Sequence, residues 1–108
     1  MEFNHYQEEA RKTAIFPTDN SIQYLALALC EESGEAAGKV KKVLRDQQGI
    51  FTDFNKSAIA LELGDCLWYI ANFAHALGYS LEDIAELNLE KIQRRQKNGT
   101  IHGSGDDR

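Results

Sequence analysis

Residues 58–77 form the least polar stretch of the chain, and only four strongly polar side chains interrupt it: Glu62, Asp65, Asn72 and His75. These side chains leave the stretch too polar to span a bilayer. Its apolar residues recur three and four positions apart and surround most of the circumference of the helix that this spacing predicts. We therefore expect a central, buried helix here.

The remaining sequence also favours helices, because the chain has one proline, no low-complexity tract and no alternating run of β-branched residues. An all-α fold with four helices is predicted, at residues 3–16, about 21–45, 57–77 and 81–97. Apolar stripes run along the second helix (Leu25, Leu29, Glu32, Ala36, Val40, Val43) and the third (Ile59, Leu63, Cys66, Ile70, Phe73, Leu77). The loop at 46–56 is expected to turn Ile50, Phe51 and Phe54 inward.

Local signals mark the ends of these helices. Pro17 is expected to stop the first helix, since proline cannot continue one. Asn20 and Gln23 resemble a capping box at the start of the second helix, and Ser80 with Asp83 forms the S-x-x-D pattern for the fourth.

The size of the chain fits one domain, at 108 residues and 43% hydrophobic composition. Residues 1–99 are expected to form it, and the glycine-rich residues 100–108 to be a flexible tail. A third helix that is apolar nearly all round needs more cover than three short partners provide. We therefore expect a homodimer or homotetramer that completes a four-helix bundle.

The net charge of −5 argues against a nucleic-acid polymer as partner, because such proteins need a basic surface. Cys30 and Cys66 lie within expected helices, and no secretory segment opens the chain. Free thiols, a cytoplasmic location and no membrane partner are expected.

The acidic residues Glu62 and Asp65 carry the main functional signal. They are the only formally charged side chains between Ser57 and Ser80, and their spacing places them on one face of the most apolar helix. An ionised carboxylate in a low-dielectric interior is normally paired, protonated or bound to metal. Their position therefore predicts a binding role.

The second helix supplies a matching acidic group, E-E-x-x-E, formed by Glu31, Glu32 and Glu35. Antiparallel packing would bring Glu32 and Glu35 toward Glu62 and Asp65. Several carboxylate oxygens at one place are the hard ligands that Mg²⁺ or Mn²⁺ favours. The sequence thus predicts a site for Mg²⁺ or Mn²⁺.

Two simpler interpretations compete with this one. In the first interpretation, the acids of the second helix are exposed and paired with Lys39, Lys41 or Lys42 on the same helix. In the second they belong to a di-iron or di-manganese bundle, a site type that uses Glu-x-x-His pairs. No histidine follows any of these acids at that spacing, and the three histidines read as satisfied or solvated side chains.

These residues resemble the MazG-like nucleoside triphosphate pyrophosphohydrolases, which pair E-E-x-x-E with a later E-x-x-D. The chain has E-E-S-G-E at 31–35 and E-L-G-D at 62–65. The sequences around these motifs also resemble the family at L-A-L-A-L-C, D-C-L-W-Y-I and N-L-E-K-I-Q-R-R. The resemblance runs from about Tyr6 to Gly99. Where the family usually has Tyr-Pro after the last of these motifs, this chain has Gln96-Lys97.

The resemblance implies a role for each matching residue. Glu32, Glu35, Glu62 and Asp65 would be Mg²⁺ ligands, and Glu31 a catalytic, water-positioning base. The residues that bind the nucleotide substrate would be Tyr69 against the nucleobase, Asn72 beside Tyr69, and Asn88, Lys91 and Arg95 at the phosphates. Without the resemblance, Trp68 and Asn72 read as packing residues, and Lys91 and Arg95 as cations at a helix C-terminus.

The activity so implied is Mg²⁺-dependent hydrolysis of a nucleoside triphosphate, ribo or deoxy, to the monophosphate and pyrophosphate. Two alternatives stay open: a related pyrophosphatase with a narrow substrate such as phosphoribosyl-ATP or dUTP, and a non-catalytic helical module that binds a metal-nucleotide.

Overall fold

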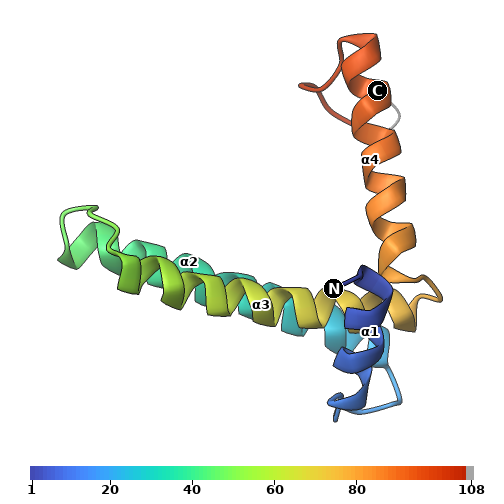
Figure 1. Ribbon diagram of the computed structural model, residues 1–108, viewed down its shortest axis with the longest axis horizontal. Coiled ribbons are helices and arrows are strands. Elements are labelled where there is room, and N and C mark those ends of the chain that lie inside the picture. The colour runs from blue at the N-terminus through green and yellow to red at the C-terminus, as the bar shows by residue number, and fades with distance from the viewer. Residues whose placement is uncertain (107–108) are drawn as a thin grey trace.

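The computed structural model describes residues 1–106, and this part of the chain contains four helices and no strand. The helices are α1 (Phe3–Lys12), α2 (Ser21–Asp46), α3 (Asp53–Ala76) and α4 (Leu81–Asn98). Helices α2 and α3 form a long antiparallel hairpin, with α1 across its open end and α4 projecting away from it (Figure 1). The all-α prediction with four helices is confirmed.

Helix α3 is the centre of the fold, as predicted. It packs against α1, α2 and α4, whereas within the described residues no Cα atom of α4 lies within 8 Å of a Cα atom of α2. The hairpin therefore places α2 beside α3, whereas most of α4 lies away from α2.

The hairpin tip differs from the expected loop at 46–56. Helix α3 begins at Asp53 because Thr52 and Asn55 form a reciprocal capping box. The Thr52 hydroxyl accepts from the backbone N–H of Asn55 at 3.2 Å, and the side-chain oxygen of Asn55 accepts from the backbone N–H of Thr52 at 3.1 Å. The short connection turns through Gly49, whose φ is +73°. Ile50, Phe51 and Phe54 are 63%, 37% and 81% exposed, so the prediction that these three side chains turn inward is wrong.

Helix α1 also ends earlier than predicted, at Lys12, well before Pro17. Asn20 precedes α2 in the left-handed region (φ 60°), and its side chain makes no capping bond, so the proposed pair with Gln23 does not form. By contrast, Ser80 and Asp83 form the predicted capping box of α4.

One buried polar side chain fixes how α1 meets the other helices. The Gln7 amide donates to the carbonyls of Ala71 (3.0 Å) and Tyr79 (3.1 Å), and its oxygen accepts from the Leu81 N–H (3.1 Å). These bonds tie α1 to the end of α3 and the start of α4. They orient α1 across the open end of the hairpin.

The core of the single chain is thin. Its buried hydrophobic residues are Ala10, Leu25, Val43, Ala71, Ala74 and Leu81, while Leu63 and Leu77 of the predicted α3 stripe are 58% and 49% exposed. The radius of gyration is 16.7 Å, against about 13 Å for a compact domain of this length. Along residues 1–106, no helix combines the length and hydropathy needed to cross a membrane.

Candidate functional site

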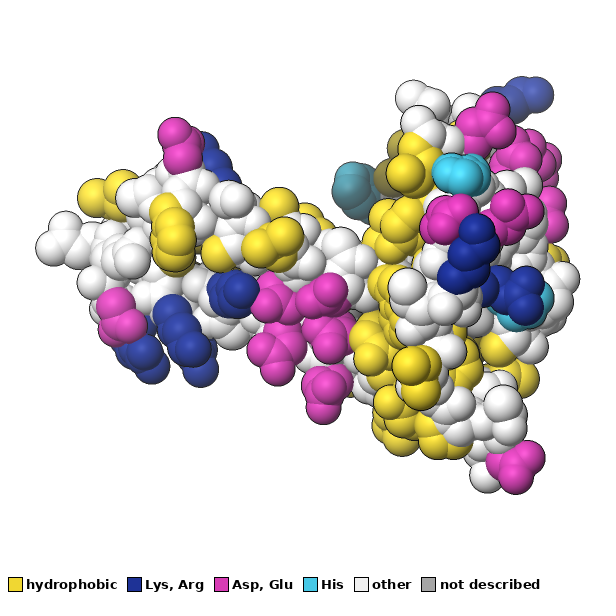
Figure 2. Space-filling view, turned by 60° about the horizontal axis from the view of Figure 1, so that its bottom comes forward, with side chains coloured by type: hydrophobic (Ala, Val, Ile, Leu, Met, Phe, Trp, Pro, Cys, Tyr) yellow, Lys and Arg dark blue, Asp and Glu magenta, His cyan; other side chains and the backbone are white. Residues whose placement is uncertain are grey.

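Three carboxylates from two helices come together on the hairpin. Glu32 lies on α2 and Glu62 and Asp65 lie on α3, and one ligand oxygen from each falls within 4.8 Å of the others. Glu32 and Glu62 are partly buried and Asp65 is exposed. Acidic side chains gather on this part of the hairpin, with basic ones on the side of its tip (Figure 2). We call Glu32, Glu62 and Asp65 the carboxylate cluster.

The electrostatics of the carboxylate cluster disfavour full ionisation. Partial burial raises the pKa of Glu32 above its ordinary value, and the negative charges of Asp65, Glu62, Glu35 and Glu31 raise this pKa further. A cation among these oxygens would relieve that repulsion. The donor set consists of carboxylate oxygens alone, which suits a hard divalent ion such as Mg²⁺ or Mn²⁺.

The two other acids of the α2 motif lie at the edge of this arrangement. Glu31 and Glu35 are exposed, and neither belongs to the group of three converging oxygens. Both are near enough for their charge to raise the pKa of Glu32. Glu35 follows Glu32 by almost one helical turn, so it borders the cluster.

Lys39 of α2 pairs with the cluster from across the hairpin. Its ammonium lies 2.9 Å from the Glu62 carboxylate and 3.4 Å from the Ala58 carbonyl oxygen. The sequence offered no basic residue near Glu62 within its own helix, and this cross-helix partner was not foreseen. The side chain of Glu62 is only 15% exposed, and the ion pair with Lys39 balances part of its charge.

Three aromatic side chains, Phe16, Trp68 and Tyr69, adjoin the cluster on the side of α1, and we call them the aromatic wall. An open depression of about 380 Å³ is lined by Thr13, Glu32, Asp65, Trp68 and Tyr69. The Trp68 indole N–H donates to the Thr13 hydroxyl at 2.8 Å, and the Trp68 and Tyr69 rings meet edge to face with centroids 4.9 Å apart. A planar ligand group therefore finds aromatic surface beside the acids.

Sequence reasoning missed part of this wall. Phe16 stacks on Tyr24 at 5.9 Å and meets Trp68 edge to face at 6.4 Å. No motif marks Phe16 or Thr13, because both lie in the irregular segment after α1. Only the tertiary packing of α1 on α3 brings them to the site.

Asn72 lies about two helical turns beyond Asp65, and its side chain is almost fully buried, at 3% exposure. Its amide donates to the Trp68 carbonyl at 3.0 Å. In the single chain this contact stabilises the end of α3 next to the aromatic wall.

The three residues predicted at the phosphates lie on α4, away from the cluster of the same chain. Asn88 is exposed, Lys91 contacts the Asp106 carboxylate at 3.5 Å, and Arg95 contacts the same carboxylate at 3.3 Å. Arg95 is 8% exposed and also donates to the carbonyls of Gly105 and Asp106. Lys91 and Arg95 thus hold the described part of the tail.

Comparison with known proteins bears on this geometry. The family model described as the MazG nucleotide pyrophosphohydrolase domain matches residues 20–100, which include the carboxylate cluster and α4. The chain is 40% identical to a protein named Gene 37 protein from Mycobacterium phage L5, in an alignment that covers all of both chains. No solved structure matches the chain. The match over most of its length shows that this chain belongs to the MazG nucleotide pyrophosphohydrolase family.

Proposed function

We propose that the protein is a Mg²⁺-dependent pyrophosphohydrolase that cleaves a nucleoside triphosphate, ribo or deoxy, to the monophosphate and pyrophosphate. The observation that carries this proposal is the convergence of Glu32, Glu62 and Asp65 from two helices. A divalent cation would offset the repulsion among three acids at such close range. Glu35, at the edge of the cluster, is the fourth proposed ligand.

The aromatic wall supports a nucleotide as the ligand of this cation. Tyr69 and Trp68 offer ring surface within the same depression as Glu32 and Asp65. A base that stacks there would leave its phosphates beside the acids. Asn72, which holds the backbone of Trp68, is proposed to help position this wall.

In the proposed reaction, water attacks at the α–β phosphoanhydride. A bond forms between the water oxygen and one of the two phosphorus atoms, the bridging P–O bond breaks, and the monophosphate and pyrophosphate separate. Mg²⁺ would supply charge that neutralises phosphate oxygens and lowers the pKa of water. Glu31, exposed next to Glu32, is proposed to accept the proton of the attacking water.

A homodimer or homotetramer is part of the proposal. The chain exposes 7992 Å², while a compact protein of its mass exposes about 6,000 Å². The excess of roughly 1,900 Å² is more than twice the area that each partner buries in a standard interface, about 800 Å². A second copy would cover this surface, and its α4 is the proposed source of Asn88, Lys91 and Arg95 at the phosphates.

The test is a turnover panel. Purified protein is incubated with the four NTPs, the four dNTPs and dUTP, with and without Mg²⁺, beside Glu35→Gln and Asp65→Asn. The proposal expects Mg²⁺-dependent release of monophosphate and pyrophosphate, lost in both variants. Turnover of dUTP alone would indicate a narrow-substrate enzyme. Metal binding without turnover of any nucleotide would contradict catalysis.

A further inference from the structure

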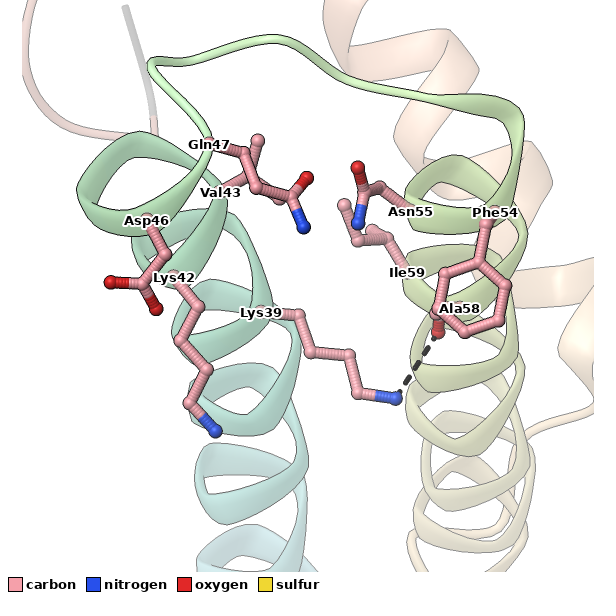
Figure 3. A pocket seen from close by; sticks show the side chains of 9 residues that line it. All are labelled: Lys39, Lys42, Val43, Asp46, Gln47, Phe54, Asn55, Ala58 and Ile59. Atoms are coloured by element: carbon pink, nitrogen blue, oxygen red, sulfur yellow. Dashed lines mark hydrogen bonds between the residues drawn. The ribbon is translucent and has the colours of Figure 1, made fainter.

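A second hollow lies at the tip of the hairpin, beyond the carboxylate cluster. It is an open groove of about 440 Å³ between the end of α2 and the start of α3 (Figure 3). Its basic side chains, Lys39 and Lys42, come from α2, and Phe54, Asn55, Ala58 and Ile59 of α3 form the opposite side. We call it the lysine groove.

The lysine groove has a positive charge that the protein does not fully balance. Asp46, its one acidic lining residue, is held by Arg45 through two hydrogen bonds of 2.8 and 2.9 Å. Within residues 1–106, Lys42 makes no ion pair within 4.0 Å, although its charge helps to lower the pKa of Asp46 after the stronger effect of Arg45. Lys39 reaches across to the Ala58 carbonyl, as Figure 3 shows, and pairs with Glu62. The groove can therefore accept an anion.

The lysine groove, the carboxylate cluster and the aromatic wall follow one another along α3. Ala58 and Ile59 line the groove, Glu62 and Asp65 belong to the cluster, and Tyr69 belongs to the wall. At 1.5 Å per residue, Asp65 lies about 9 Å along the helix from Ile59 and about 6 Å from Tyr69. Lys39 joins the first two regions, because it lines the groove and contacts Glu62.

We propose that the lysine groove receives the β- and γ-phosphates of the substrate, so that the nucleotide lies lengthwise on the hairpin with its base on Tyr69 and Trp68. Pyrophosphate then departs toward the hairpin tip. This inference rests on the proposed function, and it assigns phosphate binding to Lys39 and Lys42 of the same hairpin as the acids. Any cations that a second copy supplies from α4 would act in addition.

Lys42 gives the cleaner test, because replacing Lys39 would also leave Glu62 without its partner. The variants are Lys42→Gln, Lys42→Arg and the matched control Lys41→Gln, which removes the same charge from an exposed neighbour that does not line the groove. Binding of inorganic pyrophosphate in the presence of Mg²⁺ is measured by calorimetry. The KM for the best triphosphate of the turnover panel is measured alongside, and circular dichroism verifies folding.

Lys42→Gln is expected to weaken pyrophosphate binding and to raise KM by about fivefold, the effect of losing one charge-assisted phosphate contact. Lys42→Arg and Lys41→Gln should stay within about twofold of the wild type. Tyr69→Ala should raise KM but leave pyrophosphate affinity unchanged, because it lies at the opposite end. Equal effects of Lys42→Gln and Lys41→Gln, or no effect of Lys42→Gln on a protein that hydrolyses triphosphates, would overturn the inference. Failure of the wild type to hydrolyse any triphosphate would instead contradict the proposed function.

Discussion

The ammonium of Lys39 lies 2.9 Å from the carboxylate of Glu62 and links α2 to α3 beside the carboxylate cluster. Within residues 1–106 this is the one ion pair that involves a member of the cluster. A divalent cation bound at the cluster would therefore compete with the lysine for the same carboxylate. The protein carries a counter-charge that stabilises the metal-free site and opposes metal binding.

Removing that counter-charge should tighten metal binding. Lys39→Met is expected to bind Mn²⁺ about threefold to tenfold more tightly than the wild type, because one positive charge no longer competes for Glu62. Electron paramagnetic resonance of free Mn²⁺ measures the change. Lys41→Met serves as the control for net charge, and unchanged or weaker binding by Lys39→Met would refute this competition.

Glu32→Gln should stabilise the metal-free protein at neutral pH. The folded-state pKa of Glu32 is raised, first by burial and then by Asp65 and Glu62. The folded state therefore holds this proton more tightly than the unfolded chain does, and stability falls as the pH rises from the unfolded value of about 4.3 through the folded one. Glutamine mimics the protonated form and escapes this loss.

The measurement is thermal unfolding followed by circular dichroism in EDTA across a pH series. The midpoint of Glu32→Gln should exceed that of the wild type at pH 7, and the two should converge at acid pH. With Mg²⁺ added, the wild type should gain stability and the variant much less. A wild type more stable than Glu32→Gln at pH 7 in EDTA would disagree with the repulsion inferred for the cluster.

Gln7→Leu should lower the free energy of unfolding by about 2–4 kcal/mol. The substitution removes the buried Gln7 amide, which makes three hydrogen bonds, and leaves the three backbone groups that it contacts without these partners. Urea unfolding followed by circular dichroism gives the free energy. Gln23→Leu, at an exposed position of α2, is the matched control and should change stability little. A loss below 1 kcal/mol for Gln7→Leu would show that these bonds do not hold α1 in place.

Leu77→Lys should weaken self-association. Leu77 is 49% exposed and lines an apolar depression with Leu29, Ile70, Phe73, Ala74 and Ile84. Sedimentation velocity should find the wild type as a dimer or larger species and Leu77→Lys shifted toward the monomer, while Leu77→Met keeps the wild-type state. A wild type that stays monomeric at all concentrations would refute the proposed assembly.

The sequence predicted the helices where local signals were strong. The capping box of Ser80 and Asp83 gave the start of α4, and the apolar stretch gave α3 as the central helix. The hairpin tip was misread because Thr52 and Asn55 cap α3 earlier than its apolar pattern begins. Gln7 escaped notice because its role depends on backbone groups far away in the sequence.

For the site, the sequence predicted that antiparallel packing would bring Glu32 and Glu35 toward Glu62 and Asp65. Glu32, Glu62 and Asp65 do come together, whereas Glu35 does not belong to the group of converging oxygens. The pairing of Lys39 with Glu62 depends on the register of α2 against α3, which no motif encodes. The sequence did not reveal that α4, with Lys91, lies away from α2 in the single chain. The proposed place of Lys91 at the phosphates therefore requires a second copy.

The central claim is cleavage of the α–β phosphoanhydride at the carboxylate cluster, and ³¹P NMR of the reaction with Mg²⁺ tests it most directly. The account predicts resonances of a nucleoside monophosphate and pyrophosphate that grow together, with neither appearing for Asp65→Asn or in EDTA. Growth of nucleoside diphosphate and inorganic phosphate, or product formation by Asp65→Asn at the wild-type rate, would contradict it.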